Sequence, residues 1–313
     1  MVSIVRGLKY LFTNRTRFCD SVVKNFLRFL PDKYYLSLRY KYNMGSMVNW
    51  DNPKTFTEKI QWLKLYNRRS EYTTMVDKYA VKPYVANIIG EEYVIPTLGV
   101  WNDLKDVDWP SLPHQFVLKT THGGGSCGVI ICRDKDKLNK KDAIEKLKKS
   151  LRMDIYSLLR EWPYKNVPRR IIAEQLLVPQ NADDNQDLTD YKFFCFNGEP
   201  LYCQVIRDRH EKETIDFYDM DWQHQEFVGL NPYVQNGLTP VERPENLEKM
   251  KEICRELSKD IPFLRVDLYV IDDKIYFGEL TFFPASGFGA FSPPEWSDKL
   301  GDLIILPKII STK

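Results

Sequence analysis

The sequence lacks the usual features of several protein classes. It has six cysteines in 313 residues and no CxxC pair, which argues against a zinc cluster or a disulfide framework and favours a reducing, cytoplasmic setting. Its net charge of +2 is far from the basic excess of a dedicated nucleic-acid-binding protein. No apolar signal-peptide core is visible at the N-terminus, and no apolar run approaches the length that spans a bilayer.

Several catalytic signatures are also missing. The chain has no GxxxxGK[ST] phosphate loop, no GxSxG nucleophile motif and no persuasive Cys–His pair. It shows no internal repeat and no low-complexity tract. A hydrolase with a nucleophilic side chain is therefore not indicated, and any phosphate site must be built in another way.

The positive charge that is present gathers at the N-terminus. Residues 1–42 hold nine basic and two acidic residues, with apolar and aromatic residues interleaved between them. This pattern predicts a pair of basic amphipathic helices. Such helices either lie on an anionic membrane surface or cap the domain with a solvated basic face. Both interpretations stay open on sequence alone.

The rest of the chain predicts an α+β (α/β) protein with prominent antiparallel hairpins. We expect helices at 56–66, 71–89, 141–159 and 245–259, with Pro83 as a break or kink in the second. We expect strands at 93–96, 116–119, 129–132, 171–177 and 214–218, and hairpins at 191–207 and 263–283. Asn197-Gly198 marks the turn of the first hairpin. The predicted segments are 1–45, 46–112, 113–178 and 179–313.

A glycine-rich loop connects two of the predicted strands. Lys119 ends the first strand, His122, Gly123, Gly124, Gly125 and Ser126 follow, and a second strand begins at Val129. Glycines allow backbone N–H groups to approach an anion closely, and Lys119 stands where its ammonium could meet a phosphate. The loop is interpreted either as a phosphate cover or as an ordinary flexible hairpin turn.

The hairpin at 263–283 is the most informative stretch. If Asp267 opposes Glu279, then Arg265 opposes Thr281, and the loop is predicted at residues 272–274. One face would then carry this polar set together with Tyr269, Ile271, Ile275 and Phe277. Opposed carboxylates repel, so the pair favours a cation, and magnesium prefers such oxygens. The alternative is a surface salt-bridge cluster.

Taken in order, these parts resemble the ATP-grasp superfamily, and more narrowly the TupA-like ATP-grasp family of surface-polysaccharide biosynthesis. The phrases that carry the resemblance are NPKTFTEKIQWLK (52–64), VDKY (76–79), FVLK (116–119), DYKF (190–193) and RVDLY (265–269). The likeness runs from about residue 34 to the C-terminus. It implies an ATP-grasp fold in which two α+β lobes clamp a nucleotide, preceded by the basic helical extension.

The resemblance also implies roles for individual residues. Lys78 and Lys119 would contact phosphates, and the glycine loop with His122 and Ser126 would cover the triphosphate. The stretch of Glu174, Gln175, Leu176 and Leu177 would form the hinge beside adenine. Asp267, Glu279 and Thr281 would hold Mg²⁺, although the superfamily often has Asn where Thr281 stands. Arg265 and Lys192 would act on phosphate or on the acceptor.

The implied reaction joins a carboxylate to an amine through an acyl phosphate, with ATP and Mg²⁺ as cofactors. The expected substrates are a uronic-acid glycan of the capsule or cell wall and an amine or amino acid. Residues 1–42 would suit contact with the inner membrane face or with a lipid-linked glycan, and no nucleic-acid partner is expected. A kinase or glycosyltransferase of the same pathway, or an inactive ATP-binding scaffold, are the alternatives.

Overall fold

The computed structural model describes residues 15–125, 127–179, 188–207, 213–231 and 234–309. Ser126 and residues 1–14 of the predicted N-terminal helices lie outside the described residues. No helix of the described part combines the length and the apolar character needed to cross a bilayer.

The helices and strands alternate along the chain, and the strands form two main sheets. The helices are α2 (Arg15–Phe26), α3 (Asp32–Met44), α4 (Phe56–Tyr66), α5 (Glu71–Val76), α6 (Val81–Ile89), α7 (Lys140–Leu151), α8 (Ile155–Leu159), α9 (Leu247–Ser258) and α10 (Glu295–Asp302). Short 3₁₀ turns include η1 (Glu91–Tyr93), η2 (Leu104–Asp106), η3 (Lys135–Lys137), η4 (Trp162–Asn166) and η5 (Pro284–Gly287). The strands are β1 (Thr97–Trp101), β2 (Phe116–Thr120), β3 (Val129–Cys132), β4 (Ile171–Gln175), β5 (Asp190–Phe196), β6 (Glu199–Arg207), β7 (Thr214–Asp219), β8 (His224–Gln225), β9 (Val228–Gly229), β10 (Phe263–Ile271), β11 (Lys274–Thr281) and β12 (Phe291–Ser292).

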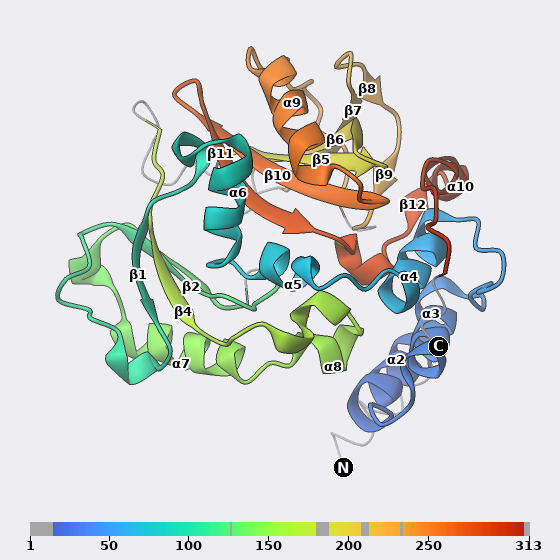
Figure 1. Cartoon of the computed structure of the whole chain (residues 1–313), viewed down its shortest axis with the longest axis horizontal. Coiled ribbons are helices and arrows are strands. Elements are labelled where there is room, and N and C mark those ends of the chain that lie inside the picture. Colours follow the sequence, from blue (N-terminus) through green and yellow to red (C-terminus); the bar gives the residue numbers. More distant parts are fainter. Residues whose placement is uncertain (1–14, 126, 180–187, 208–212, 232–233, 310–313) are drawn as a thin grey trace.

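Each of the two sheets is covered by a helix. The smaller sheet has the order β1-β4-β2-β3, and the larger has the order β11-β10-β5-β6-β7-β8. In Figure 1, α7 lies along the smaller sheet and α9 lies over the larger one. All neighbouring strands of both sheets are antiparallel, as the hairpin-rich sequence predicts.

The sheets have separate hydrophobic cores. The smaller core lies between the smaller sheet and α7 and includes Phe116, Leu118 and Leu147. The larger core joins α4, α5, α6 and α9 to the six-stranded sheet. Phe56 lies in this core and packs edge-to-face against Phe263, with 5.0 Å between the ring centroids. A capping box at Thr55 and Glu58 fixes the start of α4, and thereby the position of Phe56.

Several predicted boundaries are wrong in detail. The stretch predicted as one helix over 71–89 is broken at residues 77–80, and Pro83 lies in the first turn of α6, where proline is tolerated. The helix predicted over 141–159 is likewise two helices, α7 and α8. The strand predicted at 93–96 begins at Thr97 instead, after η1, and the strand predicted to reach Leu177 ends at Gln175.

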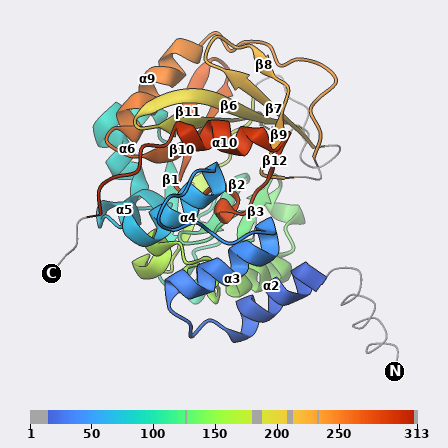
Figure 2. The same ribbon diagram turned by 90° about the vertical axis from the view of Figure 1, so that its right-hand side faces the viewer.

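The basic N-terminal segment, as far as it is described, packs as a helix pair. Residues of α3, among them Tyr35, Leu36 and Tyr40, are buried against the body of the protein. In α2 only Val23 is buried, so most of this helix faces outward. Figure 2 shows α2 and α3 along the lower edge of the molecule.

Candidate active site

A buried ion-pair cluster on the smaller sheet brings together Lys82, Lys119 and Glu174. Lys119 is the last residue but one of β2, and its Nζ lies 2.5 Å from Oε2 of Glu174 in the neighbouring strand β4. Lys82 of α6 reaches Oε1 of the same carboxylate at 2.8 Å. Glu174 is only 4% exposed. Burial raises the pKa of Glu174, but the two lysines outweigh it and lower the pKa below its usual value.

The glycine loop lies next to this cluster, between β2 and β3. Lys78 donates from Nζ to the carbonyl of Gly123, and its backbone N–H donates to Thr121 at 3.0 Å. Gly125 has a positive φ of 59°, which glycine adopts at no steric cost. Gly124 has open space where a side chain would be. The loop is therefore held at its base by Lys78 and left open toward its tip.

His122 lies beneath the loop rather than at its surface. Its side chain is 3% exposed, and neither ring nitrogen has a hydrogen-bond partner among the described residues. Burial lowers the pKa of His122, and the nearby charge of Arg169 lowers it further. The ring is thus neutral at physiological pH, and it would offer a phosphate a neutral N–H at most.

The second cluster lies on the larger sheet, at the open end of the β10–β11 hairpin. Asp267 pairs with Glu279 and Arg265 with Thr281, so the predicted register is confirmed here. Arg265 donates through Nε to Oδ1 of Asp267 at 2.7 Å, and through Nη2 to Oε1 of Glu279 at 2.9 Å. Its Nη2 also lies 3.1 Å from Oγ1 of Thr281.

A third strand completes this cluster. Lys192 of β5 stands opposite Asp267 and bonds Oδ2 of its carboxylate. Lys192 also lies 3.3 Å from Oδ1 of Asp190, two residues earlier on the same strand face. The cluster thus brings three carboxylates and two cations together.

The predicted loop of this hairpin is wrong, and the reason is a β-bulge. Ile271 pairs with Lys274, so the turn contains only Asp272 and Asp273. The register shifts after Asp267, where Leu268 pairs with Phe277 and Gly278 becomes the extra residue. The shift moves Phe277 and Ile275 to the buried face, where they are 4% and 6% exposed. Neither therefore shares the polar face, contrary to the prediction.

The two carboxylates of the hairpin differ in environment. Asp267 is 1% exposed, and burial raises its pKa more than Arg265 and Lys192 lower it. The side chain of Glu279 is 40% exposed. Burial raises its pKa too, but Arg265, Lys78 and Lys192 outweigh that effect and lower it to about 2. Glu279 is therefore ionised at neutral pH, and it is the more accessible member of the pair.

This donor set fits a magnesium ion. Magnesium prefers carboxylate oxygens, and each carboxylate oxygen can accept more than one bond, so the contacts with Arg265 leave capacity on both acids. A cation between Asp267 and Glu279 would offset the repulsion between the two opposed carboxylates. Asp267, Glu279 and Thr281 are the residues that would hold it, with Glu279 on the open side.

Lys78 connects the two clusters. It bonds the glycine loop on one side, and it lines a small cavity with Tyr164 and Glu279 on the other. Burial lowers the pKa of Lys78, while the nearby charge of Glu279 raises it. The cavity measures about 10 Å³, which is room for about one water molecule. The predicted phosphate lysines and metal ligands are therefore neighbours in space.

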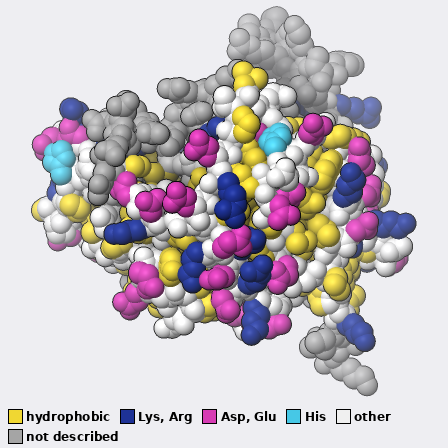
Figure 3. All heavy atoms as spheres, turned by 90° about the horizontal axis from the view of Figure 1, so that it is seen from above, with side chains coloured by type: hydrophobic (Ala, Val, Ile, Leu, Met, Phe, Trp, Pro, Cys, Tyr) yellow, Lys and Arg dark blue, Asp and Glu magenta, His cyan; other side chains and the backbone are white. Residues whose placement is uncertain are grey.

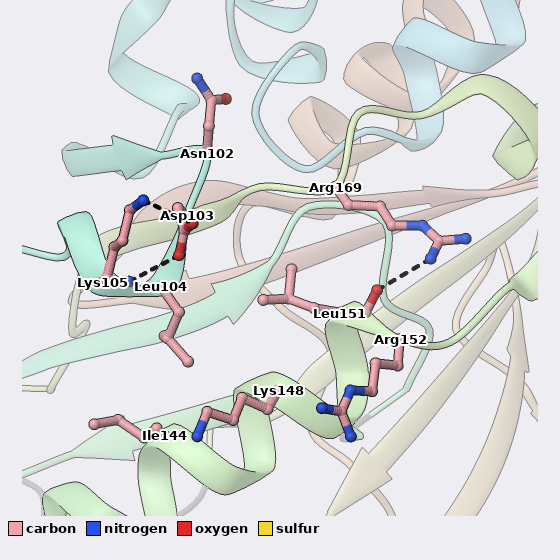
Figure 4. A pocket seen from close by; sticks show the side chains of 9 residues that line it. All are labelled: Asn102, Asp103, Leu104, Lys105, Ile144, Lys148, Leu151, Arg152 and Arg169. Atoms are coloured by element: carbon pink, nitrogen blue, oxygen red, sulfur yellow. Dashed lines mark hydrogen bonds and ion pairs between the residues drawn. The ribbon is translucent and has the colours of Figure 1, made fainter.

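A larger cavity lies away from these clusters. It measures about 500 Å³ and opens between residues 102–105, the second half of α7 and Arg169. Figure 4 shows Lys148 and Arg152 on the α7 side, and Arg169 bonded to the carbonyl of Leu151. None of the residues predicted for the site lines this cavity.

Comparison with known proteins shows which family the chain belongs to. The model of the family described as TupA-like ATPgrasp matches residues 58–305, and the chain belongs to this family. Its two-sheet architecture is accordingly an ATP-grasp fold. No curated protein matches the sequence.

Three solved structures are among those to which the chain shows similarity. A D-alanine–D-alanine ligase from Bacillus anthracis, complexed with ATP, is 16% identical over 67% of this chain and 54% of its own, with a TM-score of 0.38. The Helicobacter pylori D-alanine–D-alanine ligase is 15% identical over 80% of this chain and 69% of its own, with a TM-score of 0.43. The ATP-grasp ligase PsnB, complexed with a minimal precursor, Mg and ADP, is 13% identical over 85% and 66%, with a TM-score of 0.37. This chain thus spans little more than half of the first of these ligases.

The structure also brings in residues that were not predicted for the site. Lys82 shares Glu174 with Lys119. The sequence placed it on one predicted helix with Lys78, as part of the family resemblance, but gave it no contact in the site. Asp190 could have been found from its alternation with Lys192 on one strand. Tyr164 comes from a short 3₁₀ turn and carried no signal. Of the predicted hinge residues, Gln175 is exposed at the end of β4, and Leu176 and Leu177 follow it outside the sheet.

Proposed function

We propose that the chain is an ATP- and Mg²⁺-dependent ligase that joins a carboxylate to an amine. The observation that carries the proposal is the opposition of Asp267 and Glu279 at the end of one hairpin, with Lys78 linking them to the glycine loop. Membership in a TupA-like ATP-grasp family supports the same chemistry. A magnesium ion held there would neutralise charge on the phosphates.

The residues of the chain would act by position and charge. Lys78 and Lys119 would exchange their present partners, the Gly123 carbonyl and the Glu174 carboxylate, for phosphate oxygens of ATP. Glycines 123–125 would cover the phosphates, and residues 174–177 would lie beside the adenine. Arg265 would stabilise negative charge that develops during transfer.

The proposed reaction has two steps. An oxygen of the substrate carboxylate attacks the γ-phosphorus of ATP, the bond to the β-phosphate oxygen breaks, and ADP leaves. The resulting acyl phosphate is attacked by the amine nitrogen, which loses a proton as phosphate departs and the amide forms. Holding the two substrates together is the main contribution of such a site.

We further propose a uronic-acid glycan of the capsule or cell wall as the carboxylate substrate and an amine or amino acid as its partner. The support for this substrate class is the family resemblance. Peripheral contact with the inner membrane face or a lipid-linked glycan through residues 1–42 belongs to the same proposal. An acceptor anchored in the membrane would then meet the enzyme at its surface.

Product analysis tests the ligase. The protein is incubated with MgATP, candidate uronic-acid acceptors and mixed amines, and the products are identified by mass spectrometry. We expect ADP together with a new amide. Glu279→Gln should lower the rate by about 100-fold or more, as loss of one charge-stabilising group does. Because Glu279 is partly exposed, this variant should stay folded, and Glu256→Gln, which changes another exposed glutamate, should keep full activity.

Other outcomes would point to the alternatives. ADP with a phosphorylated sugar would make the chain a kinase, and product formation only with a nucleotide sugar would make it a glycosyltransferase. Tight ATP binding without any product from a broad acceptor panel would support an inactive scaffold. Any of these results overturns the ligase proposal.

A further inference from the structure

An aromatic corner stands out on the surface where α2 turns into α3. We define it as residues 26–34. Within these nine residues Phe26 is 73% exposed, Phe29 is 79% exposed and Tyr34 is 66% exposed. Side chains this exposed contribute little to the core, and three large ones within nine residues offer apolar surface for binding.

The corner is held firmly from behind. Arg160 donates from Nη2 to the carbonyl of Arg28 at 2.5 Å, and its Nε lies 3.1 Å from Oδ1 of Asp32. The hydroxyl of Tyr35 donates to the carbonyl of Leu158 at 2.9 Å. The inner side of the helix pair is thus anchored to the α8–η4 segment. The aromatic side chains remain on the outside of a fixed scaffold.

The charge of this segment is one-sided. Residues 15–44 contain seven basic residues and two acidic ones, Asp20 and Asp32. Asp20 is paired with Arg39 at 2.7 Å, and Asp32 with Arg68 at 2.6 Å as well as with Arg160. No acidic side chain of residues 15–44 is left to neutralise Lys24, Arg28 or Lys33. The aromatic corner is therefore surrounded by positive charge.

Another face of the molecule provides a contrast. In Figure 3, which looks onto the molecule from above, basic and acidic side chains alternate across the visible face, with apolar atoms between them. Mixed charge of this kind is usual for a solvated surface. The combination of exposed aromatics with cations alone distinguishes the α2–α3 corner from that face.

We propose that the aromatic corner docks on an anionic lipid surface. Phenylalanine and tyrosine side chains insert at the level of the headgroups, while lysine and arginine attract anionic lipids. A second copy of this chain is a poorer partner, because two such corners would bring like charges together. The occupant that suits both features is a bilayer that contains anionic phospholipids.

Docking at this corner would orient the candidate site. The guanidinium of Arg39 on α3 lies 4.8 Å from the ring centre of Phe288, in the segment that follows the β10–β11 hairpin. This segment comes directly after β11, which carries Glu279 and Thr281. Taken with the proposed ligase, this contact links the docked helix pair to the segment that follows the candidate magnesium ligands.

Vesicle flotation of the full-length chain tests the proposal. We expect binding to phosphatidylcholine vesicles that contain phosphatidylglycerol, no binding to phosphatidylcholine alone, and release by added salt. The double variant Phe26→Ser, Phe29→Ser should lower the vesicle partition coefficient by about tenfold or more. Arg28→Glu should lower it by at least about fivefold, which corresponds to one basic side chain near an anionic surface.

Leu238→Ser is the matched control, because Leu238 is 96% exposed in a distant part of the chain, and it should bind vesicles like the unmodified protein. Equal binding by the double variant would overturn the proposal, as would loss of binding only when residues 1–14 are removed. A dimer in sedimentation that the double variant dissociates would assign the corner to a second copy. Vesicle binding does not require turnover, so its failure would leave the proposed ligase activity untouched.

Discussion

At the scale of single residues, Lys64 shows how strongly burial can change the pKa of a side chain. Its side chain is fully buried, and Nζ donates to the carbonyls of Leu159 and Ser286 at 3.0 and 2.8 Å. Burial lowers its pKa from 10.5 to about 7, although Glu161 opposes that shift. The ammonium holds a turn in which Ser286 has a φ of 54°, a left-handed conformation that costs energy outside glycine.

The lowered pKa of Lys64 predicts that the stability of the protein depends on pH. Between about pH 7 and 10.5 the unfolded chain binds the Lys64 proton and the folded chain does not, so stability rises with pH over that window. Lys64→Met removes this contribution. Urea unfolding at several pH values in this window should show that the free energy of unfolding of the unmodified protein rises relative to that of the variant. The rise should be at most about 1.4 kcal/mol per pH unit. Lys41→Met, at an exposed lysine, should give a curve parallel to that of the unmodified protein, and parallel curves for Lys64→Met would contradict the assignment.

Single site residues were predictable where their spacing is local. The alternation that places Arg265 and Asp267 on one strand face is visible in the sequence, and so is the opposition of Glu279. The pair of Lys82 with Glu174 is not visible, because 92 residues separate them and only the packing of α6 beside β4 joins them. Long-range ion pairs carry no sequence period.

At the scale of elements, the β10–β11 hairpin depends on its bulge. Gly278 is the extra residue, and a Cβ there would lie 2.9 Å from Cε2 of Tyr269 and 3.0 Å from the carbonyl oxygen of Asp267. The second contact is with backbone, which cannot rotate away as a side chain can. The bulge therefore sets the opposition of Asp267 and Glu279 and cannot accept a larger residue without a shift.

Gly278→Ala should consequently destabilise the protein by about 1–3 kcal/mol, the usual cost of overpacking. Chemical denaturation measures this change. Gly124→Ala is the matched control, since a Cβ there meets nothing within 4 Å, and it should change stability by less than about 0.5 kcal/mol. A Gly278→Ala variant as stable as the control would show that the hairpin adapts without cost.

Elements with strong local signals were predicted well. The hairpin turned at Asn197-Gly198 and the helix at 56–66 are confirmed, because a turn dipeptide marks the first and helical apolar spacing marks the second. The bulge could not be predicted, since a glycine within a strand indicates a bulge only when its partners are known. The break between α7 and α8 was missed because its helical pattern continues on either side.

At the scale of the whole molecule, the two separate cores predict that one sheet can be destabilised while the other stays protected. The smaller core between α7 and the smaller sheet contains Leu147, and the larger core contains Leu264, both fully buried. Each Leu→Ala change should cost about 2–5 kcal/mol locally. In hydrogen exchange, Leu147→Ala should speed exchange in β2, β3 and α7 while β5 and β10 stay protected.

Leu264→Ala provides the comparison, and it should speed exchange in β5 and β10. Uniform acceleration over both sheets by Leu147→Ala would mean that the two cores unfold as one unit. The separate cores were not visible in the sequence, because β1 comes from the segment predicted as 46–112, yet it pairs with β4 of the segment predicted as 113–178.

The cysteines have a practical consequence for studying this protein in motion. Four of the six are buried and Cys19 is partly so, whereas Cys127 is exposed, beside the glycines of the loop between β2 and β3. A thiol-reactive fluorophore would therefore attach preferentially at Cys127 in the unmodified chain, with Cys127→Ser as the blank. Its emission would report, in real time and without further mutation, whether the surroundings of this loop change when ATP is added.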